Sequence, residues 1–468
     1  RGDDQGIYNA STETSFSRNT SPDGTFWAFG TTEDVGSLSF DNWKDAINSN
    51  PPASLGKDMV MYLPDHEEYV DIKFLAWTSN GNGGGFSYIR SVVNIPDPSP
   101  ITFDSTAGYA LDFDGTDDYM YYDRVDPNTE ESDDLPDPMT IEMWVNPDTL
   151  GNQMVLAASY GTAYQIGINS DNNFYAWFRD ADDLSRDSLY STTSLTAGQW
   201  NHLAISVGTV ADGESSEVVA KMYVNGTRED TVAYSLYRAD SDRYQFGSSR
   251  YLDNGSYYYF DGKMDEVRIW SEARTDSAIR AGMFTSNLNA TKLEIESYWQ
   301  MNEGSGNTVE DLANGQDLTL DQDGASFQPA WVTSYVPIGG GTPQITTNFQ
   351  TGTATIGNAS LSMVDGFDNP VDIQVTEVSG NPNQFPTGFT SGLGGKYFVI
   401  NLFGTPGTFS ASLTLEYGAG VVTATQQSNP GQLKLYKRGS NSTGAWIEVA
   451  SASSANSGYD IGSETGAT

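Results

Sequence analysis

The chain has 468 residues, and its 62 acidic side chains against 23 Lys and Arg give a formal net charge of −39. A surface this acidic repels nucleic acid and anionic membranes, and the absence of cysteine excludes thiolate catalysis, thiolate-bound zinc and disulfides. No apolar run approaches the ~18 residues of a transmembrane segment. No leader is recognisable, so we expect a mature secreted chain, long enough for about three domains.

Residues 1–97 are predicted to form an N-terminal β-rich domain. Alternating apolar residues predict strands at 26–30, 58–63 and 69–77, and residues 40–47 fit a helix. Residues 80–90 combine a glycine-rich loop with a strand. No helix with a suitably placed Lys or Ser/Thr follows this loop, so we interpret it as a hairpin and not as a phosphate-binding loop. A proline-rich stretch at 96–100 is a stiff linker.

Residues 101–334 contain about ten short strand-like runs separated by turn residues, which predict two packed antiparallel sheets, a jelly-roll sandwich. The runs are 109–113, 139–145, 153–158, 164–168, 174–178, 200–207, 218–224, 244–247, 257–270 and 298–301. Residues 271–283 fit a short helix capped by Thr275 or Asp276.

A Gly/Pro linker at 337–343 precedes a third unit, residues 343–468, predicted to be an Ig-like β-sandwich. Its strand-like runs are 358–364, 371–378, 397–403, 409–417, 432–437 and 445–450. The predicted fold class is therefore all-β, a multi-domain string with a central antiparallel jelly-roll sandwich flanked by smaller β-rich domains.

The stretch Asp261–Trp270 predicts a turn that enters a strand. Strand alternation places Asp265, Val267 and Ile269 on one face, so a carboxylate begins an aliphatic face. A carboxylate at the entrance of a buried face needs a partner, which is often a metal ion. A second acidic stretch, Ala110–Met120, lies about 150 residues upstream. We expect these two strands to lie together with an ion between them.

Six motifs occur in the middle unit in the order 111–119, 140–145, 198–204, 222–226, 262–270 and 299–306, followed by Asp311. In these motifs the unit resembles the LamG-like jelly roll of the concanavalin A-like lectin/glucanase superfamily. The resemblance implies a calcium ion that joins the first and last strand regions. The implied ligands are Asp114, the Gly115 carbonyl, Asp117, Asp118 and Asp265. Six acidic residues among 126–137 would also suit a second cation site, but an acidic loop is the simpler interpretation.

In the same family motifs, His202 is expected to be a core histidine, and Trp144, Trp200, Trp270 and Trp299 are expected to pack in the interior. Loop aromatics next to amides and carboxylates suit sugar rings better, although Tyr-rich loops are also common at protein interfaces. The candidate ligand-contact residues are Tyr160, Tyr164, Tyr251, Asp253, Asn254, Tyr257, Tyr258 and Tyr259.

The first unit is similar, through residues 25–30 and 83–90, to N-terminal regions of surface proteins that Bacteroidota secrete by the type 9 system, adhesins among them. This resemblance implies an extracellular, cell-surface location and O-glycosylation at Asp-Ser/Thr sequences. The candidate acceptors are Ser105, Thr149, Ser188, Thr231 and Ser277. The Asn-linked glycosylation sequons of the chain would be relevant only if its source were eukaryotic.

No enzyme activity is predicted. Retaining glycoside hydrolysis needs two carboxylates about 5 Å apart, and neither Glu294–Glu296 nor Asp265–Glu266 has the spacing of the related glucanases. The predicted function is a secreted cell-surface adhesion protein whose calcium-stabilised lectin-like module binds glycans or surfaces. The alternatives are a self-associating structural subunit of an extracellular filament or surface layer and, less favoured, an accessory module of a glycan-degrading enzyme.

Overall fold

The computed structural model shows an all-β chain with two compact units, residues 1–102 and 103–468, each described here by itself. The structure describes residues 7, 13, 21–32, 35, 38–64, 68–77, 86–90, 108–123, 138–158, 164–179, 186–208, 218–233, 243–248, 258–286, 294–320, 328–339, 344–416, 421–429, 431, 433–440, 443–451 and 458–465. None of the helices in these ranges is long and apolar enough to cross a membrane.

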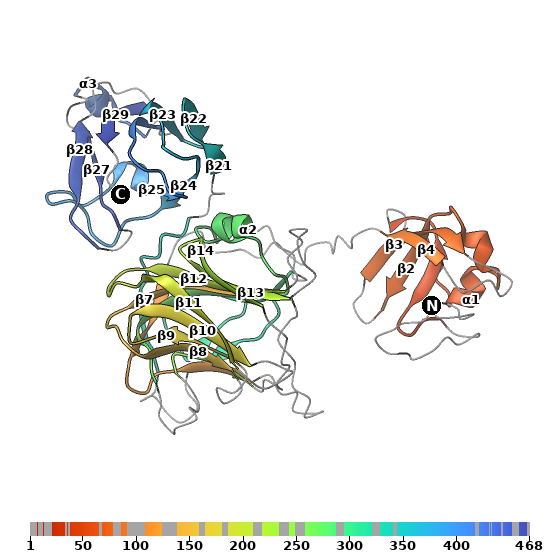
Figure 1. Cartoon of the computed structure of the whole chain (residues 1–468). Helices are drawn as coiled ribbons and strands as arrows, with labels where there is room; N and C mark the ends of the chain where they lie inside the picture. The colour runs from red at the N-terminus through yellow and green to blue at the C-terminus, as the bar shows by residue number, and fades with distance from the viewer. Residues whose placement is uncertain are drawn as a thin grey trace. The chain divides into compact units, whose positions relative to one another are not determined.

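The first unit has a four-stranded antiparallel sheet in the order β1-β2-β3-β4 (Figure 1). Its elements are β1 Phe26–Phe29, α1 Trp43–Ala46, the 3₁₀ turn η2 Pro51–Ser54, β2 Met59–Leu63, β3 Glu68–Trp77 and β4 Phe86–Arg90. The helix begins later than predicted because the Asn42 side chain accepts a hydrogen bond from Asp45 N and so caps it. Trp27 and Trp43 pack edge to face at 4.8 Å between sheet and helix.

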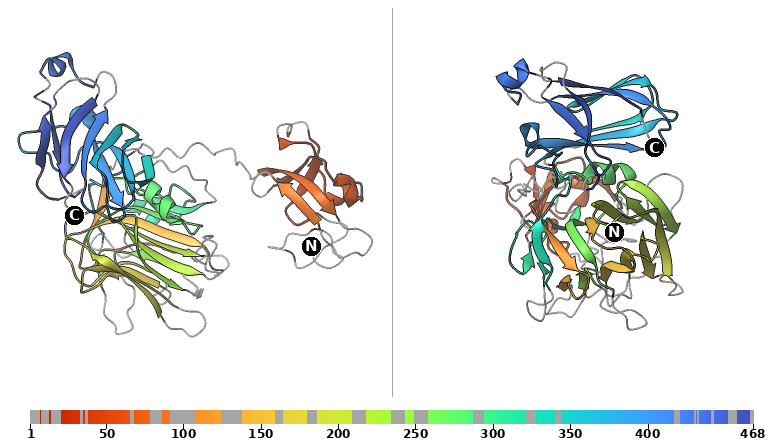
Figure 2. Two further views of the ribbon diagram at one scale, coloured as in Figure 1. Left: turned by 45° about the horizontal axis from the view of Figure 1, so that its top comes forward. Right: turned by 90° about the vertical axis from the view of Figure 1, so that its left-hand side faces the viewer.

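The jelly roll in the second unit consists of two stacked antiparallel sheets (Figures 1 and 2). The first sheet has the strand order β11-β10-β9-β8-β15-β6-β19-β18. Its strands are β6 Met120–Asp123, β8 Gln153–Ala158, β9 Tyr164–Ile168, β10 Asn173–Arg179, β11 Arg186–Ser194, β15 Arg243–Phe246, β18 Thr308–Val309 and β19 Leu318–Thr319. The second sheet has the strand order β14-β13-β12-β7-β16-β5-β20, and β17 pairs with β16. Its strands are β5 Tyr109–Asp114, β7 Met139–Pro147, β12 Asn201–Gly208, β13 Val219–Val224, β14 Thr227–Ala233, β16 Asp261–Trp270, β17 Ile295–Trp299 and β20 Ala330–Thr333.

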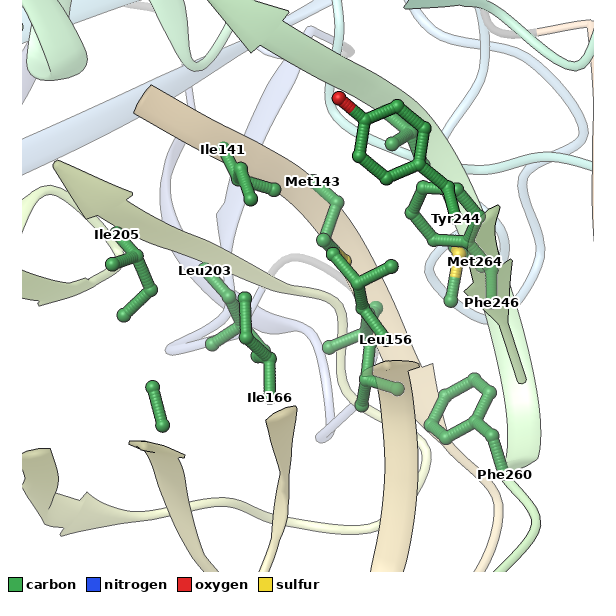
Figure 3. Packing of buried hydrophobic residues seen from close by; sticks show 14 of the residues in the cluster. Ile141, Met143, Leu156, Ile166, Leu203, Ile205, Tyr244, Phe246, Phe260 and Met264 are labelled. Atoms are coloured by element: carbon green, nitrogen blue, oxygen red, sulfur yellow. The ribbon is translucent and has the colours of Figure 1, made fainter. Parts of the chain in front are cut away.

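Apolar side chains from both sheets interdigitate to form the core of the jelly roll (Figure 3). Ile141 and Met143 of β7 meet Ile166 of β9 and Leu156 of β8, and each of these four is at most 1% exposed. Full burial of such a side chain is worth about 1.5–3 kcal/mol, so this layer dominates the stability of the domain.

The second sheet is also covered on the face that points away from this core. The helix α2, Asp276–Gly282, is capped by Thr275 as predicted, and the segment after it packs against that outer face. The Trp144 ring donates a hydrogen bond from Nε1 to the carbonyl of Met283 at 2.8 Å. This second layer explains why every residue of β7 and β12 is buried.

The C-terminal part forms three antiparallel sheets, β21-β24-β25, β22-β23-β26-β29 and β27-β28. Their elements are β21 Gln344–Phe349, β22 Thr353–Ile356, β23 Ala359–Asp365, β24 Val371–Ser379, the 3₁₀ turn η4 Leu393–Gly395, β25 Lys396–Phe403, β26 Ser410–Glu416, α3 Ala424–Ser428, β27 Lys434–Lys437, β28 Ile447–Ser451 and β29 Gly458–Thr465. The first two sheets share one apolar cluster, with Ile373 of β24 and Leu415 of β26 among its members.

The sequence analysis missed the polar edge strands β11 and β14, which have few buried residues. Carboxylates of β14 bond the β11 backbone: Asp230 accepts from Tyr190 N at 2.9 Å, and Glu229 accepts from Thr192 N at 3.1 Å. These contacts close one side of the sandwich and occupy donors that an incoming strand would otherwise use.

Candidate functional site

The turn between β5 and β6 brings together three of the carboxylates that were predicted to hold calcium. Oxygens of Asp114, Asp117 and Asp118 all lie within 4.8 Å of one another. Asp114 Oδ1 accepts from Thr116 N at 2.8 Å, and Asp118 Oδ2 accepts from Asp114 N at 2.8 Å. The backbone of the turn therefore fixes two of the three side chains; we call this group the carboxylate turn.

The carboxylate turn concentrates negative charge at a partly buried position. Burial, reinforced by the neighbouring charges of Asp114 and Asp117, raises the pKa of Asp118 to about 6. No ion pair involves these three carboxylates within the described ranges. Hard oxygen donors in one turn, with unneutralised charge, are the ligand set that a divalent cation such as Ca²⁺ prefers.

Asp261, the first residue of β16, faces this turn. Its Cα is paired with that of Asp114 across β16 and β5. A Cβ added at Gly115 would lie 2.7 Å from the Asp261 Cβ, so only glycine, with its φ of +72°, allows the approach. Asp261 Oδ2 also accepts a hydrogen bond from Thr149 Oγ1 at 2.5 Å.

The structure does not bring Asp265, the remaining predicted ligand, to the carboxylate turn. Asp265 pairs with Trp144 on β7, four residues beyond the position that faces Asp114. At about 3.4 Å per residue this separation is on the order of 13 Å. Its Oδ2 accepts from Ser334 Oγ at 2.5 Å, and only 1% of the residue is exposed.

Val267 and Ile269 share one face of Asp261–Trp270 as predicted, but the predicted faces of Met264 and Asp265 were wrong because a β-bulge interrupts the strand. The register against β7 shifts by one residue between Asp265 and Arg268, and Glu266 has a φ of +53°. Met264, Val267 and Ile269 therefore point into the core, while Asp265 and Arg268 point to the outer face. A bulge adds one residue and so reverses the alternation.

Arg268 is the centre of a buried polar network on that outer face. Its guanidinium donates to Glu266 Oε2 at 2.9 Å, to Glu142 Oε1 at 3.4 Å, and to the carbonyls of Gly282 and Thr285. Tyr298 Oη also donates to Glu266 in a short contact. The side chains of Glu142, Glu266, Arg268 and Tyr298 are 0–3% exposed, and their network holds the segment after α2 against the sheet.

The charges of this network are balanced from within the protein. Burial alone would raise the pKa of Glu142, but His202 and Arg268 outweigh it, and the pKa is lowered. Burial, together with the adjacent charge of Glu266, raises the pKa of Asp265 well above its usual value. His202 is 1% exposed with its Nε2 3.4 Å from Glu142 Oε2, which agrees with a core histidine.

The four tryptophans expected in the interior are buried, with exposures from 0% to 4%. Of the candidate ligand-contact residues, Tyr164 lies inside the core with only 2% exposed, which removes it from a ligand surface. Tyr258 and Tyr259 are partly exposed. The candidates outside the described residues are Tyr160, Tyr251, Asp253, Asn254 and Tyr257.

The candidate glycosylation acceptors lie in varied settings. Thr149, Thr231 and Ser277 are exposed, whereas Ser188 is partly buried. Ser105 and the acidic residues 126–137 lie outside the described residues.

One group of side chains of mixed chemistry was not predicted from the sequence, and four of its members, Tyr121, Gln165, Trp177 and Gln245, are only 4–9% exposed. On the first sheet, the face that points away from the core carries a set that we call the aromatic–amide face: Tyr121, Gln165, Tyr175, Trp177, Tyr190 and Gln245. Trp177 Nε1 donates to Gln165 Oε1 at 3.1 Å, and Gln245 Nε2 donates to Ser248 Oγ at 2.6 Å. The aromatic residues within 174–178 could be recognised in the sequence as part of a strand, but only the strand register shows which side chains share a face.

Comparison with known proteins places a concanavalin A-like domain in this region. The sequence model of the concanavalin A-like lectin/glucanases superfamily matches residues 114–280. No curated protein matches the chain.

Several solved structures are similar to part of the chain. The IT-sialidase CBM40 of Ruminococcus gnavus bound to α2,3-sialyllactose has 16% identity over 38% of this chain and 97% of its own, with a TM-score of 0.29. The native heptameric SAP-like pentraxin of Limulus polyphemus has 14% identity over 37% of this chain and 81% of its own, also with a TM-score of 0.29. Domain 4 of AbnA, an extracellular arabinanase from Geobacillus stearothermophilus, in complex with arabinotriose, has 20% identity over 32% and 69%, with a TM-score of 0.24.

Proposed function

With a concanavalin A-like lectin/glucanase domain at residues 114–280 as the premise, we propose that this chain is a secreted cell-surface adhesion protein. Its jelly roll binds glycans without catalysing a reaction and is stabilised by calcium. The observation that carries the calcium part is the convergence of Asp114, Asp117 and Asp118, with Asp261 facing them from β16.

The residues present fit a calcium ion on the chemistry of the donor set. Calcium takes six to eight oxygen ligands, including carboxylates and backbone carbonyls. Asp114, Asp117 and Asp118 would hold the ion, and Asp261 lies on the strand that the ion would join to β5. Calcium would supply a positive charge to offset the burial and, to a lesser extent, the carboxylate repulsion that raise the pKa of Asp118. Lys263, which follows Asp261 on β16 by two residues, is paired with Asp148 and Asp112.

The buried network supports a binding role over a catalytic one. Asp265 and Glu266 are adjacent carboxylates, but they are 1% and 3% exposed and are enclosed by Arg268, Tyr298 and Ser334. A substrate cannot reach them without unfolding the outer layer. Their role is to anchor the segment after α2.

The calcium test is thermal unfolding of the full chain in calcium and in excess chelator, with Asp114→Asn beside the wild type. We expect calcium to raise the wild-type midpoint and to leave the variant unchanged. Equal midpoints for the wild type with and without calcium would remove the ion from the proposal. Binding of the wild type to an array of neutral and sialylated oligosaccharides tests the lectin part separately.

The alternative, a self-associating subunit of a filament or surface layer, would join copies through sheet edges. At the β11 edge, the Tyr190 and Thr192 N–H groups are already bonded by β14 carboxylates, which disfavours strand addition there. Sedimentation velocity of the purified chain decides between the two functions. Species that grow with concentration would favour the filament, and a single monomeric species would favour the adhesin.

A further inference from the structure

We propose that the jelly roll and the C-terminal part (β21 to β29) act as one rigid unit, joined by a docking interface that has Arg280 at its centre. Anything that the jelly roll binds is then held in a fixed orientation to the C-terminal part. The inference goes beyond the proposed function and holds whether or not the jelly roll binds glycans. It starts from the observation that residues 103–468 form one compact unit although they contain two separate apolar cores.

The docking face of the C-terminal part is the side of β24 that points away from its own core. The apolar residues of β24 belong to that core, so strand alternation turns Asp372, Gln374 and Thr376 the other way. Gln374 is nevertheless 0% exposed and Thr376 is 1% exposed. Polar residues on the outside of a sheet stay exposed unless another layer covers them, so a second surface lies over this face.

Arg280 of α2 supplies contacts from the jelly roll to that face. Its Nε donates to the carbonyl of Gly226 at 2.9 Å, and its Nη1 donates to Asp372 Oδ2 at 3.0 Å. Its guanidinium carbon lies 4.3 Å from the centre of the Phe403 ring. The backbone carbonyl of Arg280 accepts from Gln374 Nε2 at 2.8 Å. One arginine therefore joins a jelly-roll turn to two strands of the C-terminal part.

Apolar side chains fill the interface beside this arginine. Phe403 of β25 is directly opposite Asp372 and is 5% exposed. It belongs to the same apolar cluster as Met283, Phe284 and Ile338, which follow α2 or lead out of the jelly roll. A buried aromatic anchor beside a shielded ion pair is typical of a specific interface.

The chain is also held where it leaves the jelly roll. Gly339 N donates to the carbonyl of Phe284 at 2.9 Å, and a Cβ added at Gly339 would lie 2.5 Å from the carbonyl oxygen of Glu377 on β24. Only glycine allows this approach. A further contact joins two other segments, because Gln199 Nε2 donates to Thr443 Oγ1 at 3.0 Å. Contacts from several segments oppose rotation of one part against the other.

One strip of the interface is polar and less tightly satisfied. Gln374 Oε1, Thr376 Oγ1 and Asn401 Oδ1 are buried and accept no hydrogen bond from the residues that the structure describes. Gln374 and Asn401 are directly opposite each other on β24 and β25. Water is the usual donor to such groups, and contacts between domains of one chain are more polar than a core. A single substitution should therefore open this interface without unfolding either core.

The test measures the distance between the two parts in the full chain. Because the chain has no cysteine, the substitutions Tyr190→Cys on β11 and Ile447→Cys on β28, at positions 51% and 58% exposed, accept a pair of dyes for single-molecule energy transfer. The variants made in this background are Arg280→Ala and Gly339→Ala. The control is Arg228→Ala, since Arg228 of β14 also lies beside α2 but forms its ion pair with Asp276 inside the jelly roll.

We expect one narrow distance distribution for the wild type and for Arg228→Ala. Arg280→Ala and Gly339→Ala should broaden it, and amide exchange at residues 336–339 should rise about tenfold because the exit segment is released. Circular dichroism checks that each variant is folded, and Asp372→Asn, which keeps the side-chain shape, replaces Arg280→Ala if that variant is not. A broad distribution in the wild type would overturn the rigid unit. A folded Arg280→Ala protein with the wild-type distribution and exchange would overturn the central role of Arg280.

Discussion

The jelly roll contains two groups of carboxylates that look alike in the sequence and differ completely in the structure. The carboxylate turn, Asp114–Asp118, lies at the rim, and the described residues give its three acids no cationic partner. Asp265 and Glu266 lie under the outer layer, where Arg268, Ser334 and Tyr298 satisfy them. The comparison teaches that an acidic motif indicates a cation site only when the fold leaves its charge uncompensated.

The largest effect is expected from Arg268→Ala. The substitution leaves Glu142 and Glu266 buried without their guanidinium partner, so it should destabilise the domain by about 3–5 kcal/mol. Urea unfolding measures the loss, and calcium should not restore it. A loss below about 1 kcal/mol would mean that the network does not hold the outer layer.

The next effect concerns calcium and directly distinguishes the carboxylate turn from the buried pair Asp265 and Glu266. Saturating calcium, at 100–1,000 times the dissociation constant, should stabilise the wild type by about 3–4 kcal/mol. Asp261→Asn and Asp114→Asn should lose most of this gain, whereas Asp265→Asn should keep it because Asp265 is remote from the turn. Terbium luminescence gives a second readout of cation binding. A loss of binding in Asp265→Asn alone would restore the assignment made from the sequence.

A smaller effect follows from pH in the absence of calcium. Because the pKa of Asp118 is raised to about 6 in the folded state, the folded chain binds its proton more tightly than the unfolded chain does. The resulting stability is present below about pH 4 and is lost as the pH rises through about 6, an effect of about 1–2 kcal/mol. Chelated wild type should show this slope, and Asp118→Asn should not. Unfolding midpoints from pH 4 to pH 7 measure it.

The smallest effect is expected at Lys263, whose Nζ lies 2.7 Å from Asp148 and 3.3 Å from Asp112. Lys263→Met removes a partly exposed ion pair and should cost about 0.5–1 kcal/mol without calcium. It also removes a positive charge near the carboxylate turn, so calcium affinity should rise about two- to threefold. Calorimetric titration checks the affinity, and a fall in affinity would place Lys263 in a supporting role at the site.

Much of the fold could be predicted because its strands are strongly patterned. The apolar strands β7, β9 and β12 were expected within one or two residues of their observed bounds, and the Thr275 cap of α2 was expected although the helix begins five residues later than predicted. The polar strands β11 and β14 were missed because they bury few apolar residues and are held by side-chain-to-backbone bonds that no local pattern reveals.

Part of the candidate cation site was also accessible from the sequence. A turn with the residues Asp-Gly-Thr-Asp-Asp dictates by itself that its carboxylates gather, since Asp114 caps its own turn and Gly115 takes a positive φ. The partner strand was expected, but the structure places Asp261, and not the predicted Asp265, opposite Asp114. The register of β16 against β5 decides which carboxylate faces the turn.

The sequence by itself determined the all-β class, the acidic and cysteine-free chemistry, the apolar strands and the local geometry of the carboxylate turn. These features depend on side-chain alternation and on turn residues that act within a few positions of one another. Tertiary structure alone decided that Asp261 faces Asp114, that Arg268 neutralises the buried acids, and that Tyr175, Tyr190 and Trp177 share one face with amides. Each of these depends on strand register, which is set by the packing of residues far apart in the chain, and a shift of one residue moves every side chain to the other face.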